Sequence, residues 1–130
     1  MSWWNTVLEN LNEGDVLMTP GKGIPANGQK QFTIDSIEVD RVTVHSGDYN
    51  ISLGRLCFDT LERAFANNPH LSLRVAAIKD IPPLPGSADE LIRNATHSNL
   101  ARGNYVCSIL KHCGLVRYVM QGNRKYIALP

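Results

Sequence analysis

Hydrophobic residues recur along this chain of 130 residues with two different periods, and the change of period predicts its helices and strands. Near the N-terminus, four apolar residues share one helical face: Trp4, Val7, Leu8 and Leu11. This spacing predicts an amphipathic helix over residues 3–12, which Gly14 ends. The same period predicts a helix over residues 54–66, which stops before Pro69.

Between these helices the apolar residues alternate with polar ones, as is typical of short strands. Strands are predicted at residues 15–19, 31–34, 37–39, 41–45, 49–53 and 71–77. The inward parity changes between Ile34 and Ile37, so we predict a β-bulge there, and residues 39–42 favour a hairpin turn. With the long loop at 19–30, these strands indicate a small, twisted antiparallel sheet, partly closed into an SH3-like barrel.

The last third of the chain returns to helical spacing. Ser87 and Glu90 form a capping box, which predicts a helix start. A second helical face consists of Tyr105, Val106, Ile109, Leu110 and Cys113. It predicts a helix over residues 104–113, which Gly114 ends in a left-handed conformation. Residues 115–119 and 125–129, separated by turn residues, then predict a terminal hairpin.

The proline-rich run from Ile81 to Gly86 indicates a semi-rigid linker. We therefore predict an α+β chain in two parts joined by residues 81–86. Residues 1–80 form the barrel-like sheet with flanking helices, and residues 87–130 form a helix–turn–helix–hairpin unit.

This second unit resembles a known family. The run from Val106 to Val116 (VCSILKHCGLV), the Gly-Asn-Arg tip and Lys-Tyr-Ile-Ala-Leu are similar to the recognition helix and wing of bacterial winged helix-turn-helix repressors, in particular the arsenical-resistance type. The resemblance covers residues 87–129. It implies DNA binding and transcription regulation, with helix 104–113 in the major groove and the hairpin 115–129 on the flanking backbone.

Seven polar residues of this unit are the predicted nucleic-acid-binding residues: Arg102, Asn104, Ser108, Lys111, Asn123, Arg124 and Lys125. The first lies at a helix start, where backbone N–H groups can receive a phosphate. The next three form the outward stripe of the second helix, with side chains suited to base edges and phosphates. The last three lie at the hairpin tip and can neutralise phosphates. The alternative is that this stripe is simply the solvated face of an amphipathic helix.

Charge is distributed unevenly along the chain. Residues 81–130 carry six Lys or Arg against two acids, whereas residues 1–80 carry seven against ten, and the formal net charge is +1. The whole chain therefore has no general affinity for polyanions, but its positive end coincides with the candidate binding unit.

No motif indicates catalysis, a metal or a cofactor. Gly21-Lys22-Gly23 leads into a strand, whereas a P-loop opens a helix. Asp35, Glu38 and Asp40 could suggest a nuclease, but Asp40 stands where such a site needs a lysine. The four histidines lack metal-ligand spacing. We expect a protein that is not an enzyme and has neither metal nor cofactor.

Cysteine usage and hydropathy predict the compartment. Cys57, Cys107 and Cys113 have no paired spacing, which favours buried thiols in a reducing environment. No apolar run approaches the ~18 residues of a membrane span, and the N-terminal residues lack a basic signal region. We expect a cytoplasmic protein without a membrane partner.

Two functions remain open at this point. The first is non-catalytic binding of nucleic acid, DNA in preference to RNA, through the C-terminal unit. The alternative is a protein-interaction or architectural module of a larger nucleic-acid-processing system. Such a module would bind a protein partner, or form a homodimer, through Trp3 and Trp4 or through a sheet edge. Otherwise the two tryptophans are expected to pack onto the following sheet.

Overall fold

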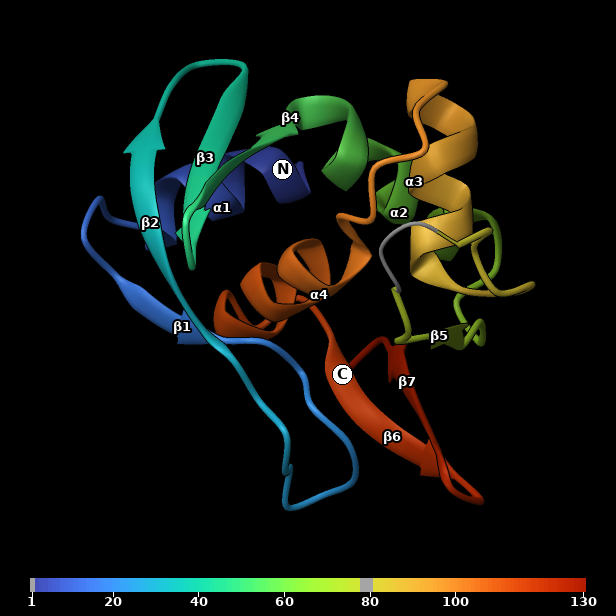
Figure 1. Cartoon of the computed structure of the whole chain (residues 1–130). Coiled ribbons are helices and arrows are strands. Elements are labelled where there is room, and N and C mark those ends of the chain that lie inside the picture. The colour runs from blue at the N-terminus through green and yellow to red at the C-terminus, as the bar shows by residue number, and fades with distance from the viewer. Residues whose placement is uncertain (1, 78–80) are drawn as a thin grey trace.

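The computed structural model describes residues 2–77 and 81–130 and has an α+β architecture (Figure 1). In chain order its elements are α1 (Trp3–Asn10), β1 (Val16–Met18), β2 (Gln31–Ile37), β3 (Arg41–Ser46), β4 (Tyr49–Gly54), α2 (Arg55–Asn67), β5 (Leu73–Arg74), α3 (Ala88–Thr96), α4 (Gly103–His112), β6 (Arg117–Gln121) and β7 (Arg124–Ala128). One antiparallel sheet has the order β1-β2-β3-β4, and a second has the order β5-β7-β6. Helix α4 lies between the two sheets (Figure 1).

The four-stranded sheet follows the predicted alternation. The register of β2 against β3 shifts between Ile34 and Ser36, which confirms the predicted bulge. Because β2 continues through Ile37, no separate strand forms at 37–39, and the chain bends at residues 39–40 into β3. β1 and β4 are the edges of this sheet and do not pair with each other. Within the described residues the sheet is therefore open, and the partly closed barrel is not formed.

Both N-terminal tryptophans make ring contacts with α2, whereas the sequence interpretation named the following sheet. The ring of Trp4 lies 5.3 Å from that of Phe58, and the ring of Trp3 lies 5.8 Å from that of Phe65. Trp4 is only 1% exposed, and its Nε1 donates a hydrogen bond of 3.1 Å to the carbonyl of Val39. Trp4 therefore stabilises the core and offers no surface to a partner.

The helix boundaries of the C-terminal unit agree with their sequence signals. The Ser87 Oγ accepts a 3.0 Å hydrogen bond from the Glu90 backbone, and the Glu90 carboxylate accepts one of 3.1 Å from the backbone N–H of Gly86. Gly114 follows α4 with a φ of +74°, the left-handed conformation predicted for it.

A buried carboxylate joins α3 to α4. Asp89 is 1% exposed, and its Oδ1 accepts hydrogen bonds from the backbone N–H groups of Arg102 (3.2 Å) and Gly103 (3.0 Å). Its Oδ2 lies 2.8 Å from the Nε of Arg93, one turn later in α3. A Cβ added at Gly103 would lie 2.7 Å from the Cβ of Asp89, so this close approach requires glycine. Asp89 therefore holds the start of α4 close against the first turn of α3.

Strand β5 joins the first part of the chain to the last. Leu73 pairs with Ile127 and Arg74 with Tyr126, so β5 extends the terminal hairpin and not the first sheet. Of the strand predicted at 71–77, only these two residues form β5. One buried cluster contains side chains from both sides of residues 81–86. The division into two parts stays a prediction, and its boundary at residue 80 lies outside the described residues.

Candidate functional site

Helix α4 is enclosed over most of its length. Its buried residues are Gly103, Val106, Cys107, Ser108, Ile109 and Leu110. Ser108, which the sequence places on the outward stripe, is 4% exposed and donates a 2.7 Å hydrogen bond from its Oγ to the carbonyl of Met18 in β1. The outward orientation of Ser108 is therefore wrong, because β1 covers this side of the helix. Most of α4 is thus buried, and its exposed residues are Lys111 and His112 at the C-terminal end.

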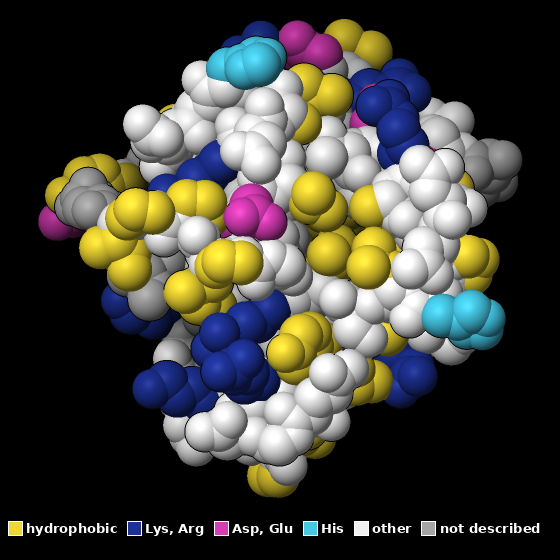
Figure 2. Space-filling view, turned by 90° about the vertical axis from the view of Figure 1, so that its right-hand side faces the viewer, with side chains coloured by type: hydrophobic (Ala, Val, Ile, Leu, Met, Phe, Trp, Pro, Cys, Tyr) yellow, Lys and Arg dark blue, Asp and Glu magenta, His cyan; other side chains and the backbone are white. Residues whose placement is uncertain are grey.

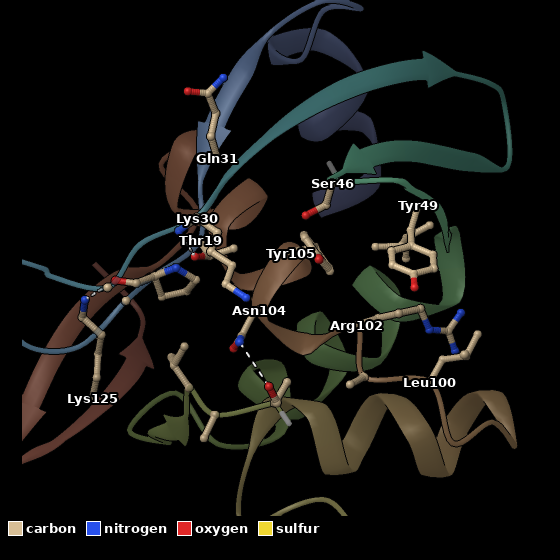
Figure 3. A pocket seen from close by; sticks show the side chains of 18 of the residues that line it. Thr19, Lys30, Gln31, Ser46, Tyr49, Leu100, Arg102, Asn104, Tyr105 and Lys125 are labelled. Atoms are coloured by element: carbon tan, nitrogen blue, oxygen red, sulfur yellow. Dashed lines mark hydrogen bonds between the residues drawn. The ribbon is translucent and has the colours of Figure 1, made fainter. Parts of the chain in front are cut away.

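A large groove opens beside the start of α4 (Figure 3). Its volume is about 1970 Å³, and it is lined by parts of the 19–30 loop, β3, β4, residues 74–77, the start of α4 and the tip of the β6–β7 hairpin. Five of the seven predicted binding residues line it: Arg102, Asn104, Asn123, Arg124 and Lys125. Ser108 and Lys111 do not line it. The structure thus brings together most of the predicted residues, but around a groove and not along a helix.

Cations dominate the charged lining of the groove. These cations are Lys22, Lys30, Arg41, Arg74, Arg102, Arg124 and Lys125. The acids in the same lining are Asp40 and Asp48. The guanidinium of Arg41 lies 3.1 Å from Asp40 and holds the pKa of that carboxyl below its usual value. The lining therefore has an excess of positive charge, although Arg41 is also paired with Glu38 at 3.3 Å and the whole chain carries a formal net charge of only +1.

Four of these cations are exposed to solvent: Lys22, Lys30, Arg41 and Arg124. Figure 2 shows a group of Lys and Arg side chains on the lower part of one face, at the height of the β6–β7 hairpin in Figure 1. Sequence reasoning misses Lys22, Lys30, Arg41 and Arg74. They belong to separate segments that only the fold brings together, although the Gly-rich character of the 19–30 loop is a partial signal.

Lys125 has a structural contact where the sequence predicts a phosphate contact. It is 6% exposed, and its Nζ donates a 2.7 Å hydrogen bond to the carbonyl of Pro20. The same Nζ lies 4.6 Å from the centre of the Tyr118 ring, a cation–π contact. Burial lowers the pKa of Lys125. Lys125 ties β7 to the 19–30 loop and so holds one end of the groove together.

Arg102 and Asn104 connect segments across the middle of the groove. The guanidinium of Arg102 donates to the Thr96 hydroxyl (2.7 Å) and to the Ser52 carbonyl (3.5 Å), and the side chain is 9% exposed. The Asn104 amide donates to the carbonyl of Ala77 at 3.3 Å. Both residues line the groove while part of their hydrogen-bonding capacity stabilises its walls.

The three cysteines are wholly or partly buried. Cys57 and Cys107 are buried and Cys113 is half-buried, and all three are free. Burial raises the pKa of Cys107 to about 12 and that of Cys113 to about 11, so both thiols stay protonated.

Within residues 2–77 and 81–130, no three His, Cys, Asp or Glu side chains gather to hold a metal ion. No helix of these ranges has the length and apolarity needed to cross a membrane.

Comparison with known proteins adds no family. No family model, curated protein or solved structure matches this chain. The resemblance to winged helix-turn-helix repressors therefore stays a prediction, and the groove is the feature from which a function can be inferred.

Proposed function

We propose that this chain is a non-catalytic nucleic-acid-binding protein and that the groove beside α4 is its binding surface. The observation that carries the proposal is the concentration of seven Lys and Arg against two acids in one groove of a nearly neutral chain. A phosphate backbone is the common biological polyanion that such a concentration of positive charge attracts. We expect DNA, in preference to RNA, to be the nucleic acid that binds.

The proposal differs from the recognition-helix interpretation in the residues that it requires. Lys30 and Arg124 are exposed cations of the groove lining, contributed by the 19–30 loop and the hairpin tip. Lys111 is also exposed, but it lies near the C-terminal end of α4, outside the groove lining. Contact through α4 requires Lys111, whereas contact through the groove does not.

Charge reversal separates these two interpretations. We expect the protein to bind a fluorescently labelled mixed-sequence oligonucleotide at about 50 mM salt, and to release it as the salt concentration rises. Lys30→Glu combined with Arg124→Glu should weaken binding by about tenfold or more, because two attractive contacts become repulsive. Fluorescence polarisation measures both effects.

Two matched reversals serve as controls. Lys111→Glu tests the end of α4, and Arg63→Glu changes an exposed cation of α2 that is outside the groove lining. Each should change the affinity by less than about twofold. Absence of binding to any single or double strand at low salt would refute the proposal. A loss on Lys111→Glu as large as that of the double reversal would return the contact to α4.

A further inference from the structure

One end of the groove combines an exposed aromatic ring with a guanidinium. Tyr49 begins β4, is 65% exposed and lines the groove with Arg102 and Leu100. Figure 3 shows the Tyr49 hydroxyl and the Arg102 guanidinium pointing toward one another, with Leu100 beside them. Leu100 is 62% exposed, so this end offers apolar as well as charged surface. An aromatic face next to a cation is the combination that holds an unpaired base and its phosphate.

Arg102 lacks a carboxylate partner among the described residues. No described carboxylate oxygen lies within the 4.0 Å ion-pair distance of its guanidinium, and its buried Nε has no hydrogen-bond partner. Asp89, which accepts from the Arg102 backbone, is engaged by Arg93. Buried cations are normally paired, so a phosphate that enters the groove would supply the missing negative charge. The hydrogen bonds to Thr96 and Ser52 already hold the guanidinium in place.

The position of these charges distinguishes one strand from two. Arg102 and Lys125 are nearly buried in the groove lining, so only a ligand that enters the groove comes close to them. A duplex is a stiff cylinder that is commonly bound by elements inserted into its own grooves, and most of α4 is buried and cannot be inserted in this way. A single strand is flexible, can follow a concave path and can turn its bases toward aromatic side chains.

We infer that the groove takes a single nucleic-acid strand, with one base stacked on Tyr49 and the adjoining phosphate facing Arg102. This inference rests on the proposed function and narrows its substrate class to unpaired strands. Tyr49 supplies stacking area that does not depend on base identity, so binding is expected to tolerate sequence changes.

The test compares three labelled probes of one mixed sequence, each about 12 nucleotides long: single-stranded DNA, single-stranded RNA and duplex DNA. We expect at least one single strand to bind about tenfold or more tightly than the duplex, measured by fluorescence polarisation. Tyr49→Ala should weaken single-strand binding about fivefold or more and leave the duplex affinity unchanged. Tyr49→Phe keeps the ring and should retain the single-strand affinity.

Thermal unfolding of the Tyr49 variants checks that both fold, which their exposed position favours. Duplex binding as tight as that of both single strands would overturn the inference and leave the proposed function standing. Equal losses on both kinds of probe after Tyr49→Ala would also overturn it. Failure of all three probes to bind would overturn the proposed function as well.

Discussion

Two arginines of the C-terminal region show how differently the fold uses the same side chain. The α3–α4 corner is the buried contact of Asp89 with Arg93 in α3 and with the backbone of residues 102–103 at the start of α4. Arg93 is 5% exposed, pairs with Asp89 at 2.8 Å and donates to the Ile81 carbonyl at 2.7 Å. Arg124, at the start of β7, is exposed in the groove lining. Both add equally to the charge of residues 81–130, yet Arg93 is engaged within the fold and Arg124 is accessible to a ligand. The partners that each cation already has within the fold, and not its contribution to the sequence charge, decide whether it can bind a ligand.

Removing a buried, paired charge and removing an exposed charge are expected to change different quantities. Removing one partner of a buried ion pair leaves an uncompensated charge away from water, which is strongly destabilising. An exposed charge is solvated and screened, so its removal changes folding little but alters attraction to a polyanion. Substitutions at the corner should therefore act on the free energy of unfolding, and substitutions in the groove on the dissociation constant.

The largest effect is expected at Asp89. Asp89→Ala should lower the free energy of unfolding by about 3–5 kcal/mol, because it removes the buried carboxylate that pairs with Arg93 and accepts from the backbone N–H groups at the start of α4. The pair Arg55–Asp59 is the matched control, since it has the same four-residue spacing but lies at the surface. Asp59→Ala should cost less than about 0.5 kcal/mol. Urea unfolding followed by circular dichroism measures both changes. Similar losses of stability in the two variants would contradict the distinction between the buried and the exposed ion pair.

A smaller loss of stability is expected at Gly103. Gly103→Ala places a Cβ 2.7 Å from the Cβ of Asp89 and 2.9 Å from its Cα, so α3 and α4 must separate. Such overpacking costs about 1–3 kcal/mol. The nucleic-acid affinity of the remaining folded protein should change less than that of the Lys30 and Arg124 variants. A variant as stable as the parent would mean that α3 and α4 can separate at little energetic cost.

The groove cations should contribute to the salt dependence of nucleic-acid binding. Lys30→Ala combined with Arg124→Ala should reduce the slope of log Kd against log salt concentration by about 1.4–1.8, since each phosphate contact contributes about 0.7–0.9. At about 0.15 M salt we expect a loss near tenfold, or ~1.4 kcal/mol. Arg63→Ala is the control and should leave the slope unchanged. An unaltered slope in the double variant would remove these two residues from the interface.

Local signals in the sequence were sufficient for most of the helices. The cap at Ser87, the glycine at 114 and the apolar period of residues 54–66 predict boundaries within a few residues, because neighbouring residues decide them. The β2 bulge is likewise visible, since a change of inward parity needs an extra residue.

Long-range contacts account for what the sequence did not reveal. Nothing local distinguishes Ser108 on a solvated face from Ser108 under β1, where its hydroxyl satisfies the Met18 carbonyl. The two residues of β5 have no signal that selects β7 as their partner. The groove itself exists only after several separate segments assemble, so the sequence predicts five of its lining residues but not the surface that they form.

The smallest expected effect lies where β4 meets α2. Gly54 is the N-cap of α2, has an ordinary extended conformation (φ −67°) and makes no side-chain cap, and an added Cβ would meet nothing within 4 Å. Gly54→Ser can therefore supply the missing hydrogen bond and should raise the free energy of unfolding by a few tenths of a kcal/mol. Ser87→Gly is the reciprocal change at α3 and should lower it by at least a similar amount. Gly54 also lines the groove but carries no charge. Gly54→Ser should therefore leave the slope of log Kd against log salt concentration unchanged. A change in that slope would show that uncharged residues of the groove lining, and not only its cations, affect binding.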